Sequence, residues 1–404
     1  MKSEGWGGRA PLRSRRVPHE DEPNELHRRL EAHRRAGRPI LDLTESNPTR
    51  VGLSRLDEAA RAALAPERLS TYEPDPRGAR PAREAVAAYL EERAAASGRP
   101  LAAPFDPDAV LLTAGTSEAY AHLFRLLCDP GDRVLAPRPS YPLIAPLAAL
   151  EGVELATYRL VYDGRWRPDL ESLEAALLPG TRALLVVEPN NPTASVLRPE
   201  EAGEIVSICE RAGLSLVSDE VFGDFPWSPG GAPLPGHLGT DRVPTFVLGG
   251  ISKLCGLPQL KLGWIAVSGP ARARREAIRG LEWIGDLFLT VAGGVQHALP
   301  RILGSRGPYL ARVSRRIREN LAALDRAAED SGAYERLEGD GGWTAVLRVA
   351  TGRSGELGGL AALERGVYVH PGHFYDLPDD RYAAVSLLPE PAEFREALAR
   401  LAPA

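Results

Sequence analysis

The sequence predicts an α/β protein whose large domain has a mostly parallel seven-stranded sheet covered by helices on both faces, with a smaller α+β domain beside it. Between residues 108 and 268, short β-branched or Leu-rich runs alternate with segments of helix length, as in strand–helix–strand units. These runs are apolar almost throughout, which is typical of strands buried on both faces. The seven expected strands are 109–113, 133–136, 154–160, 182–187, 214–218, 245–248 and 262–267.

The C-terminal third follows a different pattern, which predicts the smaller domain. A long helical stretch at 309–328 precedes fewer strands in an interrupted order. We expect small-domain strands at 343–349, 367–369 and 382–388, and helices at 357–364 and 392–401. Between the strands of the large domain, amphipathic helices are expected at 117–128, 169–178 and 199–211.

A chain of 404 residues is too long for one compact core, so two domains that share an interface are expected. We place the large domain at residues 56–300 and the small domain at 301–404. Residues 1–55 show no sheet of their own and are expected to form an N-terminal arm that packs with the small domain. The start of this arm is polar and rich in Gly, Pro and Arg, without the apolar core of a secretion signal.

Composition excludes several classes of partner. The formal net charge is −5 and the charged residues are interspersed, which argues against a nucleic-acid or membrane-surface partner. The most apolar stretch, 142–150, is too short to span a membrane and holds a second proline. Cys128, Cys209 and Cys255 have no short spacing, so they predict neither a disulfide framework nor a zinc site. We expect a cytoplasmic protein.

A lysine in a small-residue loop is the strongest local signal of function. Lys253 ends the stretch Gly-Gly-Ile-Ser-Lys at 249–253, directly after an expected strand. Partial desolvation at such a place lowers the pKa of the amine and leaves a nucleophile able to form an imine. Taken alone, a Ser-Lys pair is better explained by a solvated loop lysine, so this signal decides nothing by itself.

A carboxylate stands at the end of the expected strand 214–218. Asp219 and Glu220 lie where open α/β sheets bind ligands, outside the carboxyl ends of the strands. Facing a pyridine nitrogen, a carboxylate would keep that nitrogen protonated and strengthen the ring as an electron sink. The alternative interpretation is a helix N-cap.

Two turns follow other expected strands. The stretch Thr-Ala-Gly-Thr-Ser at 113–117 leads into a helix, and its free amides with the helix dipole suit a phosphate, although a plain N-cap would have the same sequence. Asn190 and Asn191 lie between two prolines, in a turn that aims amides inward or is merely structural.

These four signals occur in one order, each at the end of an expected strand. In that order and spacing, residues 40–390 resemble the fold-type-I pyridoxal-phosphate enzymes, and among them the class I and II aminotransferases. The resemblance implies pyridoxal 5′-phosphate (PLP) as cofactor. It also implies small-molecule partners, an amino donor and a keto acid, and no metal.

The resemblance implies a role for each matching residue. Lys253 would carry the cofactor as a Schiff base and then shuttle the proton of the substrate. Asp219 would pair with the pyridinium nitrogen, Asn191 would bond the ring hydroxyl and contact substrate, and Tyr141 would stack on the ring. Phosphate contacts are implied for Gly115, Thr116, Ser117 and Ser252, and, across the interface of a homodimer, for Tyr72. Ser46 lies in the strip that closes over the substrate.

Two cofactor positions depart from the family pattern. Phe222 stands where a tyrosine usually bonds the ring hydroxyl, so one hydrogen bond is lost. Lys261 stands where an arginine usually meets the phosphate, so a point charge replaces a bidentate fork.

The departure with most bearing on substrate lies near the C-terminus. The family arginine that binds the substrate carboxylate matches Ala384 here. Arg381 is nearby but should face the other side of the strand. Either another cation takes over, for which Arg348, Lys261 and Arg77 are considered, or the carboxylate is absent or held differently.

Two weaker features remain. Asp286 falls near the place where dicarboxylate-specific relatives have a side-chain-selecting arginine, so an acid there would favour a cationic or neutral amine. A solvated loop aspartate is the alternative. His370 and His373 lack a third ligand nearby, and the intervening proline argues against a metal pair.

Three functions are compatible with these residues. The first is a PLP-dependent aminotransferase acting between an amino acid or amine and a 2-oxo acid. The second is a PLP-dependent lyase, cyclase or decarboxylase acting on an atypical, for example cationic, amino acid, which the loss at Ala384 favours. The third is a cofactor-binding sensor domain, for which the residues ahead of the fold leave no room for a DNA-binding helix-turn-helix.

Overall fold

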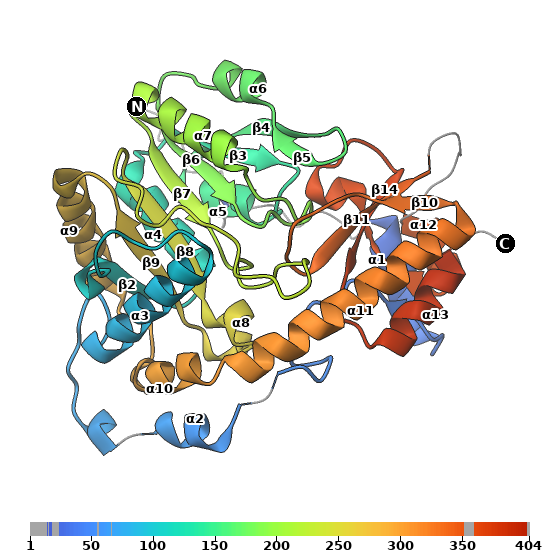
Figure 1. Cartoon of the computed structure of the whole chain (residues 1–404), viewed down its shortest axis with the longest axis horizontal. Helices are drawn as coiled ribbons and strands as arrows, with labels where there is room; N and C mark the ends of the chain where they lie inside the picture. The colour runs from blue at the N-terminus through green and yellow to red at the C-terminus, as the bar shows by residue number, and fades with distance from the viewer. Residues whose placement is uncertain are drawn as a thin grey trace, which may run out of the picture.

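The computed structural model describes residues 14, 16–17, 24–54, 56–65, 67–350 and 359–401. Its large sheet has eight strands in the order β2-β9-β8-β7-β6-β3-β4-β5 (Figure 1). Strands β4, β3, β6, β7 and β8 run parallel, while β9 is antiparallel to both β8 and β2. The strands are β2 (Val110–Thr113), β3 (Arg133–Arg138), β4 (Glu154–Tyr162), β5 (Trp166–Pro168), β6 (Thr181–Val187), β7 (Ser215–Asp219), β8 (Thr245–Gly250) and β9 (Gly263–Ser268).

The seven expected strands are therefore confirmed, and the prediction missed only β5. That three-residue strand pairs antiparallel with the end of β4 as the second half of a hairpin. Its identity depends on pairing rather than on an apolar run, because its middle residue, Arg167, is exposed.

Helices cover both faces of the large sheet, as expected of a sheet with apolar strands. One face, which includes Leu216 and Val247, packs against α3 (Arg80–Ala96), α6 (Leu170–Ala175), α7 (Pro199–Ala212) and α10 (Gly293–Gly304). The alternate residues Val217 and Phe246 face α4 (Thr116–Leu127), α5 (Ile144–Glu151) and α9 (Ala271–Phe288).

The C-terminal part has a four-stranded antiparallel sheet in the order β10-β11-β14-β13. Long helix α11 (Gly307–Ser331) runs from beside the large sheet to this small one, with α13 (Pro391–Leu401) packed against it (Figure 1). The strands are β10 (Tyr334–Arg336), β11 (Thr344–Val349), β13 (His370–Pro371) and β14 (Tyr382–Ser386). The expected helix 357–364 appears as α12 (Gly359–Glu364), and its first two residues lie outside the described ones.

The described N-terminal residues contact this C-terminal part. Strand β1 (Leu41–Asp42) pairs in parallel with β12 (Val367–Tyr368), and α1 (Glu25–Arg35) packs on α12. The division at residues 55 and 300 stays a prediction. Of the start of the chain, only Ser14, Arg16 and Val17 are described before residue 24.

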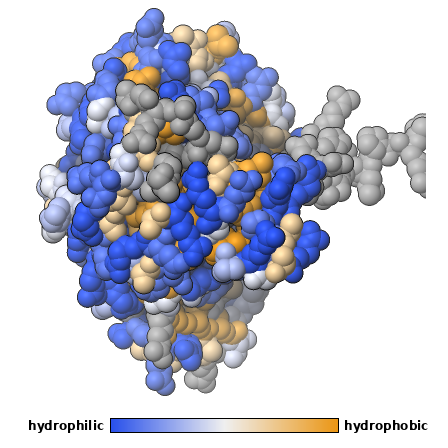
Figure 2. All heavy atoms as spheres, turned by 90° about the vertical axis from the view of Figure 1, so that its right-hand side faces the viewer, coloured by the Kyte–Doolittle hydropathy of each residue, from blue (hydrophilic) through white to orange (hydrophobic). Residues whose placement is uncertain are grey.

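The surface over the C-terminal side is mostly hydrophilic, with small apolar groups between (Figure 2). Among the helices of the described residues, none combines the length and apolar character needed to cross a membrane.

Candidate active site

Three neighbouring parallel strands bring the candidate site together at one edge of the large sheet. Val187 at the end of β6 pairs with Asp219 at the end of β7, and Asp219 pairs with Leu248 near the end of β8. The carboxyl ends of these strands therefore meet. Asn191, Asp219 and Lys253 follow or end them, so all three lie along this edge.

Lys253 lies in α8 (Ile251–Leu254), the short helix that follows β8. Its Nζ is 5.0 Å from the ring centroid of Trp343 and 5.6 Å from that of Phe222. Burial lowers the pKa of this amine, and the Asp219 carboxylate opposes the shift. A larger share of the amine is therefore unprotonated and nucleophilic than for a lysine in water.

Asp219 is buried, and its oxygens are only partly satisfied by the protein. Oδ2 accepts a hydrogen bond from the Tyr120 hydroxyl at 2.9 Å, and Oδ1 accepts one from the Val221 amide at 3.3 Å. Burial raises the pKa of Asp219 to about 6, against the lowering effects of Tyr120, Val221 and Lys253. A buried carboxylate with a raised pKa is stabilised by any cation brought next to it.

The neighbouring acid, Glu220, has a structural role instead. It forms a 2.5 Å ion pair with the Arg93 guanidinium and accepts the backbone amide of His237 at 2.8 Å. Of the two acids in this stretch, only Asp219 is left for a ligand.

Of the two asparagines, likewise, one has a structural role and the other is left for a ligand. Asn190 donates from Nδ2 to the Pro139 carbonyl at 3.1 Å and to the Thr193 hydroxyl at 2.8 Å, so it ties the turn after β6 to the turn after β3. The Oδ1 of Asn191 is buried and has no partner among the described residues. An unsatisfied buried amide calls for a ligand or water.

The turn between β2 and α4 has two features of an anion-binding site, an uncapped helix start and a nearby lysine. Gly115 precedes the helix with φ of +143°, and no side chain caps the helix start. A Cβ on Gly115 would lie 3.5 Å from Nζ of Lys261, so this cation stands beside the turn. A helix N-terminus with a lysine next to it favours a phosphate, and Thr116 and Ser117 form its first turn.

A second glycine lets this turn approach β8. A Cβ on Gly263, the first residue of β9, would lie 3.0 Å from the Cα of Gly115 and 3.0 Å from the Gly249 carbonyl oxygen. A larger side chain at residue 263 would therefore push the turn away from the strand that leads to Lys253.

The other predicted site residues lie in different surroundings. Tyr141 is 43% exposed, and the Asp219 charge, after burial, raises its pKa, which indicates that it lies near this carboxylate. Ser252 is half-buried next to Lys253. The Ser46 hydroxyl donates to the Thr44 carbonyl at 3.2 Å. Tyr72 is 81% exposed and Asp286 is exposed on α9, so within one chain they face outward.

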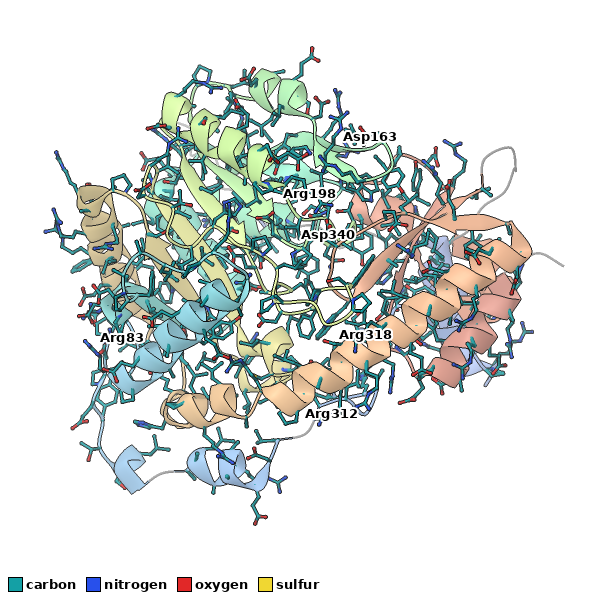
Figure 3. The ribbon with its side chains drawn as sticks, viewed as in Figure 1. Arg83, Asp163, Arg198, Arg312, Arg318 and Asp340 are labelled. Atoms are coloured by element: carbon teal, nitrogen blue, oxygen red, sulfur yellow. The ribbon has the colours of Figure 1, made fainter. Side chains whose placement is uncertain are left out.

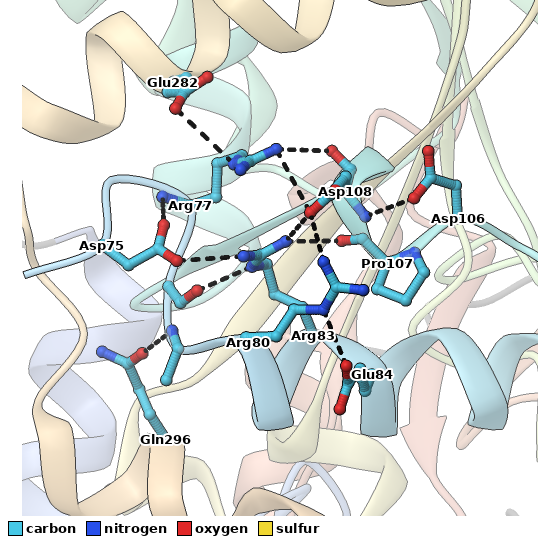
Figure 4. A network of polar contacts seen from close by, with 12 residues as sticks. Asp75, Arg77, Arg80, Arg83, Glu84, Asp106, Pro107, Asp108, Glu282 and Gln296 are labelled. Carbon is cyan, nitrogen blue, oxygen red and sulfur yellow. Dashed lines mark hydrogen bonds and ion pairs between the residues drawn. The ribbon is translucent and has the colours of Figure 1, made fainter.

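On the substrate side, Ala384 is fully buried on β14 and pairs with Val346 and His370. The three arginines weighed from the sequence are committed elsewhere. Arg348 donates to Glu335 at 2.7 Å, and Arg381 pairs with Asp379 at 2.8 Å. Arg77 belongs to an ion-pair network with Asp108 and Glu282, at 3.5 and 3.8 Å (Figure 4).

Lys261, the remaining substitute considered, stands at the Gly115 turn. The two histidines also have other partners: His370 bonds the Tyr375 hydroxyl at 3.0 Å, and His373 lies 3.9 Å from Asp380. In the described part of the chain, no group of three or more His, Cys, Asp or Glu residues could hold a metal ion.

The sequence analysis missed two residues of the site, one that contacts Asp219 and one that contacts Lys253. Tyr120 lies one turn into α4 and reaches Asp219 across the sheet edge. Trp343 comes from the start of β11, and it packs edge-on against Phe222 at 5.4 Å between centroids. The rarity of lysine could have marked the two site lysines. Among the 49 basic residues of the chain, only Lys2, Lys253 and Lys261 are lysines.

Hydrogen bonds between the loop after β7 and the residues just before β11 hold Trp343 in place. The Trp227 indole donates to the Gly342 carbonyl at 2.9 Å, and the Gly342 amide donates to the Phe225 carbonyl at 2.8 Å. Just before them, Asp340 forms a 3.1 Å ion pair with Arg198 (Figure 3).

Comparison with known proteins agrees with this site. Residues 38–401 match the sequence model of the family aminotransferase class I and II. The chain belongs to this family. Nicotianamine aminotransferase 1 of Oryza sativa subsp. japonica is 30% identical over 282 residues, which cover 67% of this chain and 54% of that protein. S-alkyl-thiohydroximate lyase SUR1 of Arabidopsis thaliana is 32% identical over 233 residues, covering 56% and 48%.

Solved structures show the same fold. Alanine aminotransferase from Pyrococcus furiosus superposes with a TM-score of 0.82 at 21% identity, over 93% of this chain and 94% of that one. The curated relatives named above are longer, and the matched part of this chain covers less than two thirds of either.

Family members depend on PLP, and the residues present here fit that group. The buried Asp219 suits a protonated ring nitrogen, and the unpartnered Oδ1 of Asn191, which is an acceptor, suits a ring hydroxyl that donates to it. The uncapped start of α4 with Lys261 suits a phosphate.

Proposed function

We propose that this chain is a PLP-dependent aminotransferase that transfers an amino group between an amino acid or amine and a 2-oxo acid. The supporting observation is the meeting of two buried ionisable groups at one sheet edge, the Lys253 amine with a lowered pKa and the Asp219 carboxylate with a raised one. Perturbed pairs of this kind concentrate at catalytic sites.

When bound, PLP supplies an electron sink that stabilises negative charge on the carbon next to the amine. The protein supplies position and proton transfer. The Lys253 amine would hold the cofactor and, once freed by the incoming substrate amine, would move the proton of the substrate carbon, a task suited to an amine with a lowered pKa. Asp219 holds the proton of the ring nitrogen, and Tyr120 holds Asp219 in place.

The remaining residues anchor the group. Oδ1 of Asn191 would accept from the ring hydroxyl, and Tyr141, which lies near Asp219, would flank the ring. Thr116, Ser117 and Lys261 hold the phosphate at the start of α4.

Two spectroscopic steps test the proposal. The purified protein should absorb visible light as lysine-bound PLP does, and an amino donor should convert the cofactor to its amine form. A 2-oxo acid should then restore the original spectrum. Product formation without this half-reaction would contradict the aminotransferase assignment.

A lyase, cyclase or decarboxylase reaction on the same scaffold is the second candidate. It is favoured by Ala384, because the bond that breaks is chosen by how the substrate is oriented, and the usual carboxylate anchor is missing. SUR1, which is named as a lyase, is among the relatives.

We also propose that the active unit is a homodimer. Trp283 and Leu287 on α9 are 71% and 67% exposed, and Tyr72 is 81% exposed. Exposed apolar side chains of this size favour an interface, in which Tyr72 would reach the partner's phosphate site. Sedimentation should give a dimer for the wild type and a monomer for Trp283→Glu. A wild-type monomer with full activity would contradict the proposal.

A further inference from the structure

The N-terminal strip places the main chain of Glu45 against β14, the strand on which Ala384 lies. On β14, Ala384 and Ser386 are two residues apart, so their side chains face the same side. The Ser386 hydroxyl donates to the Glu45 carbonyl at 2.8 Å, and the Ser386 amide donates to the Leu43 carbonyl at 2.6 Å. The main chain of Glu45 is therefore tied to the face of β14 on which Ala384 lies, which leaves its carboxylate on a side chain that starts from this face.

The Glu45 carboxylate is only partly neutralised. Its Oε1 accepts the Asn47 amide at 2.8 Å, and its Oε2 lies 3.4 Å from the Arg50 guanidinium. The Glu45 side chain is 24% exposed, whereas that of Arg50 is 75% exposed, so water screens the pair. This end of the site keeps most of a negative charge.

A further cation near this corner, Arg34, opposes the rise that burial and the Asp42 charge cause in the pKa of Tyr368, but its side chain is 52% exposed and pairs with Glu31 at 3.1 Å. His370, opposite Ala384 in the sheet, bonds Tyr375, and burial lowers the pKa of its imidazole although Asp42 opposes the shift. Asp42 accepts the Thr44 amide at 2.8 Å and the Thr44 hydroxyl at 2.6 Å. At neutral pH the corner therefore holds two carboxylates and a neutral imidazole, with Arg50 facing solvent.

We propose that the amino donor is a primary amine with no carboxylate on its reacting carbon, and that a second cationic group on this amine is favoured by Glu45. The proposal rests on the proposed function. An α-carboxylate placed at Ala384 would lose water without gaining a bidentate partner and would meet like charge, whereas an amine meets neither cost.

Matched ligand pairs test the donor class directly. The PLP-loaded protein is titrated with tyramine against tyrosine and with cadaverine against lysine, and dissociation constants are read from the absorbance change of the bound cofactor. We expect each amine to bind at least about tenfold more tightly than its amino acid, a difference that one lost charged hydrogen bond can produce. Equal or tighter binding of the amino acids would overturn the proposal.

The same titration distinguishes a failure of the proposed function from a failure of the proposed donor class. A protein that holds no PLP, or whose cofactor responds to none of the four compounds, would overturn the proposed function, and the donor class with it. A cofactor that responds to amino acids alone would overturn only the donor class.

Substitutions then test whether residues 384 and 45 cause the preference for amines over amino acids. Ala384→Arg should raise the affinity for tyrosine and lysine about tenfold, with Ala384→Gln as the uncharged control. Because residue 384 is fully buried, both variants could fail to fold, so Glu45→Gln gives a second measurement. This variant should bind cadaverine severalfold more weakly than the wild type does, and its affinity for tyramine should be unchanged.

Arg50→Gln is the matched control at the strip. If Arg50 were the substitute carboxylate anchor, this variant would weaken both amino acids and leave the amines unchanged, which would overturn the proposal. We expect it to leave the amino acids unaffected, because the Arg50 side chain is mostly exposed and paired with Glu45.

Discussion

The cofactor edge and the substrate corner of this protein are built in different ways. The cofactor edge stands on the ends of β6, β7 and β8, and its groups are buried and complementary to a phosphorylated pyridine. The proposed substrate corner is assembled from the N-terminal strip and the small sheet, where Ala384 is buried on β14 and the main chain of Glu45 bonds Ser386. The difference teaches that the chemistry is held by a rigid sheet edge, while specificity changes where separate segments meet.

Among substitutions at the cofactor edge, Lys253→Ala is expected to reduce turnover most. Without the amine, neither attachment of PLP nor proton transfer is possible, so we expect turnover to fall by roughly a thousandfold or more. Single-turnover absorbance measurements check the loss. Lys261→Ala is the matched control, and it should keep the lysine-bound spectrum while weakening PLP binding. Full activity in Lys253→Ala would refute the assignment.

Asp219→Asn is expected to have the next largest effect. The amide cannot hold a positive charge on the ring nitrogen, so turnover should drop by about 10²–10⁴-fold. Steady-state kinetics at saturating PLP measure the drop. Glu220→Gln is not a suitable control because it would break the Arg93 ion pair. Unchanged kinetics in Asp219→Asn would mean that Asp219 does not face the ring.

Tyr120→Phe tests the support of Asp219. It removes the 2.9 Å hydrogen bond to the carboxylate, and a hydrogen bond to a charged group contributes about 1.5–3 kcal/mol. We expect the pKa of Asp219 to rise further and PLP affinity at neutral pH to fall by roughly ten- to a hundredfold. Fluorescence titration with PLP measures the change. A variant that binds PLP as the wild type does would show that the hydroxyl has no positioning role.

The smallest expected effect is a pH dependence of PLP binding. The Asp219 pKa is raised to about 6, so the carboxylate is charged above that pH and protonated below it. The contribution of Asp219 to the affinity should therefore be constant above about pH 6 and fall by up to about tenfold per pH unit below it. Titrations from pH 5 to 8 check this, and Asp219→Asn should flatten the part due to this residue. A rise in affinity on acidification would contradict the sign.

The sequence was sufficient where a local pattern decides structure. The apolar runs located the seven long strands, and small polar residues following them marked the sheet edge. Strands β5, β10 and β13 have two or three residues each and exist through tertiary pairing, so no run could reveal them. Tyr120, Trp343 and Glu45 escaped for a similar reason, because each acts on a residue about 90 or more positions away.

Attachment of the cofactor to Lys253 is the central claim, and borohydride reduction followed by peptide mapping tests it most directly. Only three lysines exist in the chain, Lys2, Lys253 and Lys261, so the assignment is unambiguous. We predict that reduction fixes one phosphopyridoxyl group per chain, on the peptide that contains Lys253. A label on Lys261 or Lys2, or no label on protein saturated with PLP, would contradict the account.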